Sequence, residues 1–368
     1  MQIKQIEYDK YYKIYITLNN ITKEISDDDV KEMYQYIKNN KISVIYENYY
    51  GDIEILTTYK EKRKNILEEQ SLKDFPVLYL QGSSCKQHQL AGISLMGVIK
   101  KDLFCNYIKV EYIENQNVKV GTVIKYEKTE ELYLMSIVGD EDCRKRKSFK
   151  EEMDSLYKNM VYLIEQHGFS QRDIYRTYFY LKDLLIDYAE FNNSREKYFR
   201  ENFKEITWYP ASTCIMGNSI YHDRAVSNIW AIKSENMDIV EVMHSGRQCE
   251  ALDYKKLFSR GVLLTNMNKR CYISGTASIG ETGDTLFIDD YKKQIDQTFE
   301  CVQNLLRSKE MDFDKIVSCH AYLKKKEFES YFIEKMEIVS AQFFPVVCVI
   351  ADVCRDDLLF EMDIVAEN

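Results

Sequence analysis

The sequence predicts an α+β protein built from tandem units, each with a mixed β-sheet that carries its helices on one face. The first observation is an internal repeat, because residues 150–183 align without a gap on residues 292–325. The second is that the flanking segments repeat in the same order, which reads β-β-α-β-α-β-β in each copy. The third is a composition of 45% hydrophobic and 30% charged residues, which is typical of a globular protein.

The opening half of each copy predicts two strands, one helix and a third strand. A strand pair joined by a polar turn begins at Gly121 in the first copy and at Gly261 in the second. Apolar residues at helical spacing follow, with Met153 aligned on Ile295, and they indicate an amphipathic helix. A short polar break then leads into a β-rich run in both copies.

The closing half of each copy predicts a second helix and two further strands. After the helical stretch each copy meets a proline, Pro210 or Pro345, and then an apolar strand. We therefore place the first unit at residues 119–235 and the second at residues 258–368, with residues 236–257 as the connecting segment.

Residues 1–118 predict a further α+β region. Residues 3–18 have the pattern of alternating strands, and residues 25–40 begin with a run of aspartates and end near a lysine, which favours a helix. The region is about as long as one copy of the repeat, which leaves open whether it is a degenerate third unit.

Composition and absent motifs exclude several classes of function. With 50 Lys and Arg against 59 Asp and Glu, the net charge of −9 disfavours nucleic-acid binding. No apolar run is long enough to cross a membrane, and the N-terminus lacks the apolar core of a signal peptide, so we expect a cytoplasmic protein. Neither a glycine-rich nucleotide loop nor a GxSxG nucleophile elbow is present.

The cysteines and histidines show no metal-binding pattern. The 10 cysteines are spread over the chain without a CxxC pair, and the 5 histidines never have HxxxH or HxH spacing. We interpret most of the cysteines as small buried apolar residues. The sequence therefore predicts no metal site, and we expect no organic cofactor.

The second copy resembles the RidA/YjgF family, whose fold is also described as chorismate-mutase-like. The resemblance lies in residues 272–280 (YISGTASIG) and in the closing strand around Glu361 and Asp363. In that family a β-β-α-β-α-β-β unit forms trimers with ligand clefts between neighbouring units. The family's carboxylate-binding arginine has no counterpart, since residues 345–347 are Pro-Val-Val here, and this counts against an enamine or imine deaminase.

A closer resemblance, to the chorismatases, covers residues 121–368. It depends on motifs in a shared order, among them RTYFYL at 176–181, FNNSR at 191–195, PASTCIMG at 210–217, SGRQC at 245–249, SGTASI at 274–279 and DVCRDDLLFEMD at 352–363. The resemblance implies tandem RidA-like units, either as an intramolecular pseudo-trimer in a monomer or as a homotrimer. It also implies an enzyme of secondary metabolism that removes pyruvate from chorismate to give 3- or 4-hydroxybenzoate.

Glu361 is the candidate catalytic acid. A carboxyl on an otherwise apolar strand has a raised pKa when it is buried, and it can then protonate an enol ether near neutral pH. Strand alternation alone favours the alternative, a solvent-facing face shared by Glu361 and Asp363. The resemblance to the chorismatases assigns the catalytic role to Glu361.

Cys354 is the second candidate catalytic residue. The resemblance implies that a cysteine here accompanies formation of a hydroxybenzoate, whereas an alanine accompanies hydrolysis to a dihydrodiol. On an ideal strand Cys354 and Glu361 point to opposite faces, so a turn within residues 354–357 is needed to bring them together. The candidate substrate-binding residues are Arg195, Arg247, Cys214, Tyr178, Arg355, Thr276 and Ala277, with Arg260 as a weaker candidate.

The chain departs from the chorismatase pattern in the loop after residues 245–249. The basic, proline-rich loop of that family is shortened here, and Lys255 or Lys256 is the nearest cation. This departure leaves open a non-catalytic protein of the same fold that binds a small ligand.

Overall fold

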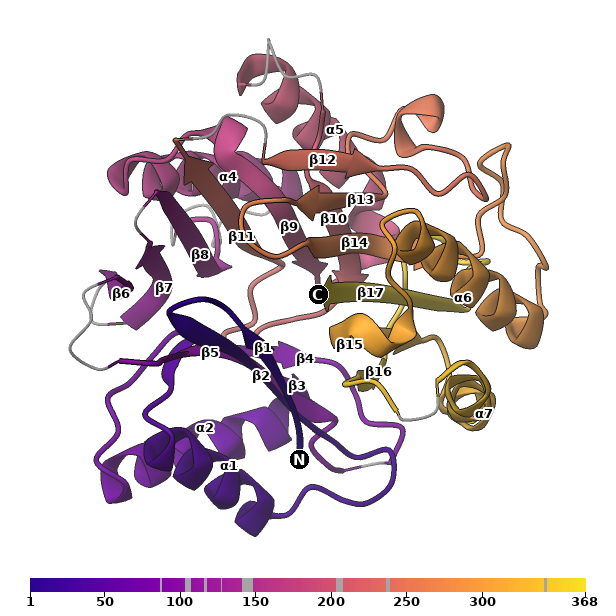
Figure 1. The fold of residues 1–368 in the computed structure, drawn as a ribbon. Helices are drawn as coiled ribbons and strands as arrows, with labels where there is room; N and C mark the ends of the chain where they lie inside the picture. Colours follow the sequence, from indigo (N-terminus) through magenta and orange to yellow (C-terminus); the bar gives the residue numbers. More distant parts are fainter. Residues whose placement is uncertain are drawn as a thin grey trace.

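The protein contains three β-sheets of related topology (Figure 1). The computed structural model describes residues 1–86, 88–102, 107–115, 118–126, 128–140, 148–202, 208–235, 239–340 and 343–368. Among these residues no helix is both long and apolar enough to span a membrane.

The first sheet lies in the N-terminal region and has the order β1-β2-β5-β3-β4, in which only β3 and β4 run parallel. Helix α1 begins at a capping box in which Ser26 and Asp29 bond each other's backbone, which agrees with the aspartate-rich start seen in the sequence. The elements are β1 (Gln2–Glu7), β2 (Tyr11–Asn19), α1 (Asp27–Asn39), β3 (Ser43–Gly51), α2 (Ile53–Glu69), β4 (Val77–Gln81) and β5 (Gly92–Lys100).

The second sheet has the order β10-β9-β11-β8-β7-β6, and β9 and β10 form its parallel pair. Its elements are β6 (Lys109–Asn115), β7 (Val118–Lys125), β8 (Thr129–Ile137), α4 (Phe149–Gln166), the 3₁₀ turn η1 (Gln171–Asp173), β9 (Ile174–Leu181), α5 (Leu184–Asn202), β10 (Ala211–Met216) and β11 (Ala225–Ser234).

The third sheet has the order β12-β13-β14-β17-β15-β16, with β15 and β16 parallel. Its strands are β12 (Val240–Met243), β13 (Gly261–Leu264), β14 (Arg270–Ala277), β15 (Ile316–Leu323), β16 (Val347–Ile350) and β17 (Phe360–Glu367). Its helices are η2 (Ala251–Tyr254), α6 (Tyr291–Arg307), η3 (Phe313–Lys315), η4 (Lys326–Phe328) and α7 (Glu329–Val339).

The prediction of an α+β protein built from repeated units is confirmed. Once the extra edge strands β6 and β12 are set aside, all three sheets place their strands in one order, first-second-last-third-fourth. The N-terminal sheet follows this order as well. The boundaries drawn at residues 118, 235 and 257 stay predictions; β6 lies before the first of them, and β12 lies within the predicted connecting segment.

Each sheet packs one face against its own helices and turns the other face toward the other two sheets. The helix-covered faces form three separate apolar clusters, in which Leu95, Leu134 and Ile364 are examples from the three sheets. The opposite faces share one core rich in tyrosine, to which all three sheets contribute. Strands β9, β15 and β17 are therefore buried on both faces, and a polar residue on their inner face does not reach solvent.

Three equivalent hydrogen bonds join the sheets. The N–H that ends each edge strand donates to a carbonyl of the next sheet: Gln81 to Asn218 at 2.7 Å, Met216 to Asp352 at 2.9 Å, and Ile350 to Ser83 at 2.8 Å. The three units are thus arranged around an approximate threefold axis.

Candidate functional site

A cavity lies at the junction of the second and third sheets. Together with the open space at its mouth it measures about 560 Å³. Helix α5 and strand β10 form one wall, and β14, β17 and the loop between β16 and β17 form the other. The lining residues are Tyr188, Arg195, Ser212, Cys214, Tyr254, Lys256, Phe258, Arg260, Gly275, Ala277, Ile279, Cys354, Arg355, Leu358 and Glu361.

Glu361 lies in the cavity wall near the start of β17 and is only 4% exposed. Burial, and after it the nearby Asp363, raise the pKa of this carboxyl to about 8, although Arg260 and Arg176 oppose the rise. The protonated form therefore predominates at neutral pH. The solvent-facing alternative considered for Glu361 is wrong, because the inner face of β17 is covered by the other two sheets.

Because Gly275 has no side chain, it leaves room for the Glu361 carboxyl. A Cβ built on Gly275 would lie 2.0 Å from Oε1 and 3.0 Å from Cδ of Glu361. The neighbouring Thr213 holds this segment of β14, since its Oγ1 accepts a hydrogen bond of 3.0 Å from the Gly275 N–H. Any side chain at position 275 would displace the carboxyl.

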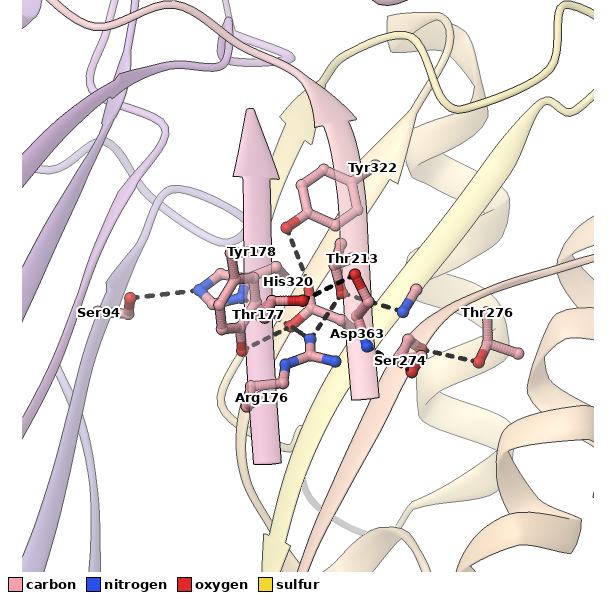
Figure 2. Close-up of polar contacts among 12 residues, drawn as sticks. Ser94, Arg176, Thr177, Tyr178, Thr213, Ser274, Thr276, His320, Tyr322 and Asp363 are labelled. Carbon is pink, nitrogen blue, oxygen red and sulfur yellow. Dashed lines mark hydrogen bonds and ion pairs between the residues drawn. The ribbon is translucent and has the colours of Figure 1, made fainter. Parts of the chain in front are cut away.

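A buried polar network connects this segment to the centre of the molecule (Figure 2). Arg176 donates from Nη2 to Thr213 Oγ1 at 2.6 Å and lies 3.5 Å from Asp363 Oδ1. Asp363 also accepts a hydrogen bond of 2.7 Å from the Tyr322 hydroxyl and lies 3.2 Å from His320 Nδ1. These partners hold the pKa of Asp363 below its usual range despite burial, so a charged carboxylate stands beside the neutral Glu361.

Four cationic side chains line the same cavity, and none of them has a carboxylate partner within the described parts of the chain. Arg195 is 4% exposed and donates to Asn192 Oδ1 at 2.7 Å, and Arg260 is 2% exposed and donates to the Cys249 carbonyl. Arg355 donates to the Gly283 carbonyl at 2.8 Å. Lys256 Nζ lies 5.2 Å from the centre of the Tyr188 ring, and burial lowers its pKa. The cavity is therefore built for an anionic ligand.

Two thiols complete the lining. Cys354 lies in a bend at residues 354–357, ahead of β17, and this change of direction brings it into the same cavity as Glu361. Burial raises the pKa of Cys354 to about 11, and burial also raises the pKa of Cys214 well above its usual value. Both are protonated at neutral pH, so neither is an activated nucleophile.

The structure brings together seven of the ten residues singled out from the sequence: Glu361, Cys354, Arg195, Cys214, Arg355, Ala277 and the weaker candidate Arg260. The other three do not line the cavity. Arg247 is exposed in the loop before η2. Tyr178 is buried in the central core with its hydroxyl 3.5 Å from Asp363, and the Thr276 hydroxyl donates to the Ser274 carbonyl.

Tyr188 and Tyr254 are cavity residues that the sequence did not assign, and Lys256 was named there only together with Lys255 as the cation nearest the shortened loop. Tyr188 lies on a helix whose other lining residue is Arg195, and spacing of seven residues on one helix face was the signal that could have found it. Tyr254 and Arg260 approach across a loop, with the Arg260 guanidinium 5.4 Å from the Tyr254 ring centre. No pattern in the sequence indicates that contact.

Comparisons with known proteins agree with this architecture. Residues 250–368 match the family model described as Endoribonuclease L-PSP. A crystal structure of a chorismatase is similar over 98% of this chain and 100% of its own, at 12% identity and a TM-score of 0.63. A putative endoribonuclease L-PSP from Entamoeba histolytica (20% identity, TM-score 0.31) and RidA from the Antarctic bacterium Psychrobacter sp. (16%, 0.30) each cover 35% of this chain and 99% of their own.

No curated protein matches the chain. The similarity to the chorismatase extends over all three sheets. The predicted resemblance is therefore confirmed at the level of the fold: the chain has the fold of a chorismatase over nearly its whole length, and its last unit matches the Endoribonuclease L-PSP family.

Proposed function

We propose that this protein is a chorismatase-type enzyme that removes pyruvate from chorismate and leaves a hydroxybenzoate. The observation that carries the proposal is the combination in one cavity of a buried carboxyl with a pKa of about 8 and four cations that lack carboxylate partners among the described residues. Chorismate has two carboxylates and one vinyl ether. It therefore requires two cationic subsites and one proton donor.

Glu361 is the proton donor in this proposal. Its proton goes to the methylene carbon of the enolpyruvyl group, which produces an oxocarbenium ion. In the simplest route the bond from the ring carbon to the ether oxygen then breaks, and its electron pair completes the ketone of pyruvate. Loss of a ring proton makes the ring aromatic and restores Glu361, so chorismate divides into hydroxybenzoate and pyruvate without net use of water.

The four cations bind and orient the two carboxylates. Arg195 and Lys256 lie at the α5 side of the cavity, and Arg260 and Arg355 lie at the side of the third sheet. Placement of the vinyl ether against Glu361 requires that both carboxylates be held at once, because a misplacement of about 1 Å can cost 100-fold in rate. Cys354, beside Glu361, is proposed to favour the aromatic product over hydrolysis.

The test is incubation of the purified protein with chorismate, followed by chromatography of pyruvate and the aromatic product. We expect equal amounts of the two, and loss of both in Glu361→Gln. The matched control is Glu300→Gln, a change at an exposed position on α6, which should leave turnover unaltered. Absence of pyruvate with a folded wild-type protein would refute the proposal.

A further inference from the structure

The junction between the third and first sheets repeats the geometry of the cavity between the second and third. Cys214 of β10 pairs with Phe179 on β9, and Cys348 of β16 pairs with the aligned residue of the repeat, Ala321 on β15. Cys354 is the fourth residue after β16 ends, and Cys85 is the fourth residue after β4 ends. The thiol pair Cys214 and Cys354 at the first junction thus has a counterpart in Cys348 and Cys85 at the second.

The second junction lacks the proposed catalytic acid. Glu361 pairs with Tyr322, the residue before the end of β15, and Gly92 pairs with Tyr50, the residue before the end of β3. Gly92 therefore stands where Glu361 stands in the third sheet. A Cβ on Gly92 would lie 2.7 Å from Val347 Cγ1, so this space is filled by an apolar side chain and cannot hold a carboxyl.

A different carboxyl reaches the thiols at the second junction. At the first junction Tyr188 of α5 lies in the cavity wall with Cys354. At the second junction the carboxyl of Glu329, the residue that begins α7, lies beside the thiols of Cys85 and Cys348. The ligand atoms of Cys85, Glu329 and Cys348 all lie within 4.8 Å of one another.

One buried oxygen atom of this cluster has no hydrogen-bond partner among the described residues. Glu329 Oε1 is buried and has no hydrogen-bond partner in the described parts of the chain. Cys348 is 1% exposed, whereas Cys85 is half-buried and gives access from the surface. A buried acceptor left unpaired beside two thiols is unfavourable unless a further group joins them.

We propose that Cys85, Cys348 and Glu329 form a binding site for a zinc ion at the junction of the third and first sheets. Two thiolates and one carboxylate supply three ligands, and a water or a small ligand completes a tetrahedron. Thiolates select zinc over magnesium and calcium, which prefer oxygen ligands. The site would have a net charge of −1, and the ammonium group of Lys86, which interacts with Glu329, offsets it.

The proposed zinc site takes no part in the chorismate reaction. It stabilises the contact between the first and third sheets. The test is titration of the full-length, fully reduced apoprotein with Co²⁺ and then Zn²⁺. We expect about one metal per chain, an intense thiolate-to-cobalt absorption band that Zn²⁺ bleaches, and a higher midpoint of thermal unfolding with metal. Cys85→Ala and Cys348→Ala should abolish the band, and Glu329→Gln should weaken binding about 10-fold.

The matched control is Cys301→Ala, because Cys301 is a buried cysteine on α6 outside the cluster. It should retain the cobalt band even if it lowers the unfolding temperature. Absence of a thiolate band in wild type, or a band that survives Cys348→Ala, would overturn the proposal. Recovery of a Cys85–Cys348 disulfide from air-exposed protein, with no metal bound to the reduced form, would overturn it as well, in favour of a redox pair.

Discussion

Glu361 is a carboxyl whose environment, rather than its position in the chain, sets its chemistry. Burial raises its pKa to about 8, and an acid catalyst acts only in its protonated form. We therefore predict that kcat for pyruvate release is constant below about pH 7 and falls as the pH rises through about 8. The measurement is a pH–rate profile at saturating chorismate; a profile that rises across this range would contradict the role of Glu361 as acid.

The same pKa affects stability, with a sign that can be worked out. The folded-state value of about 8 exceeds the ordinary 4.5, so the contribution of Glu361 to the free energy of unfolding is complete below pH 4.5 and is lost as the pH rises through about 8. Glu361→Gln has no such loss. Chemical denaturation should show wild type losing stability relative to this variant between these two values, and parallel curves would contradict the raised pKa.

Gly275 is required by close approach rather than by backbone conformation. Because an added Cβ would lie 2.0 Å from Glu361 Oε1, Gly275→Ala must displace the carboxyl. We predict that kcat falls at least about 100-fold while the protein stays folded. The control is Gly51→Ala, where the nearest atom to an added Cβ lies 3.6 Å away. Equal activity of the two variants would mean that the Glu361 carboxyl is not in place for catalysis.

Arg195 and Arg247 test whether the cavity or the sequence motif identifies the substrate-binding residues. Both were assigned to the substrate on the resemblance, but Arg195 lines the cavity and Arg247 is exposed outside it. We predict that Arg195→Ala raises KM for chorismate at least about 10-fold and that Arg247→Ala leaves KM within about twofold of wild type. Steady-state kinetics distinguishes the two, and the reverse order would mean that the 245–249 loop closes over the substrate.

At the scale of elements, the turn between β16 and β17 decides which side chains meet. The bend at residues 354–357 places the Cys354 thiol beside Glu361, although strand alternation would separate them. A protonated thiol here occupies space that water would otherwise enter. We predict that Cys354→Ala keeps pyruvate release but shifts part of the product from hydroxybenzoate to the dihydrodiol. Chromatography of both products is the measurement, and an unchanged ratio would remove Cys354 from the proposal.

The elements themselves could be predicted well because each unit repeats one pattern. The gapless alignment of 150–183 on 292–325 corresponds to α4 and β9 in one sheet and α6 and β15 in the other. The solvent-facing alternative for Glu361 failed for a physical reason. Alternation shows that two residues share a face but not what covers that face, and here two other sheets cover it.

The residues of the candidate site could be predicted only where they belong to a continuous sequence motif. Glu361 and Cys354 come from one continuous motif, and Arg195 from another. Lys256 lies in the cavity because the shortened loop folds back against Tyr188. No local sequence pattern indicates this folding of the loop. The proposed zinc ligands Cys85 and Cys348 escaped the search for paired ligands because the threefold arrangement, rather than local spacing, brings them together.

At the scale of the whole molecule, the shared core holds 12 of the 29 tyrosines of the chain. Three inner sheet faces meet there, and tyrosine fills the space while its hydroxyl satisfies buried charges. Tyr15 of β2 donates to Glu367 of β17 at 2.5 Å, which links the first sheet to the third. The units therefore depend on one another for the burial of their charged residues, which favours a single cooperative unfolding transition.

The most consequential of these buried charges is the ion pair between the second and third sheets. Glu131 and Arg270 are each 1% exposed and join through two hydrogen bonds of 2.7 and 3.0 Å. Arg270 holds the pKa of Glu131 at about 2 despite burial, so the charged form is favoured in the folded state. Removal of one partner leaves the other charge buried and unpaired.

We predict that Glu131→Gln lowers the free energy of unfolding by about 3–5 kcal/mol at pH 7. Because the folded pKa of Glu131 lies below the ordinary 4.5, its contribution is complete above that pH and is lost as the pH falls toward about 2. The difference between wild type and variant should therefore shrink on acidification. The control is Glu130→Gln, which breaks a half-exposed pair with Lys233 and should cost no more than about 1 kcal/mol. Urea denaturation at several pH values measures both, and equal costs for the two variants would mean that the sheets do not depend on the buried pair.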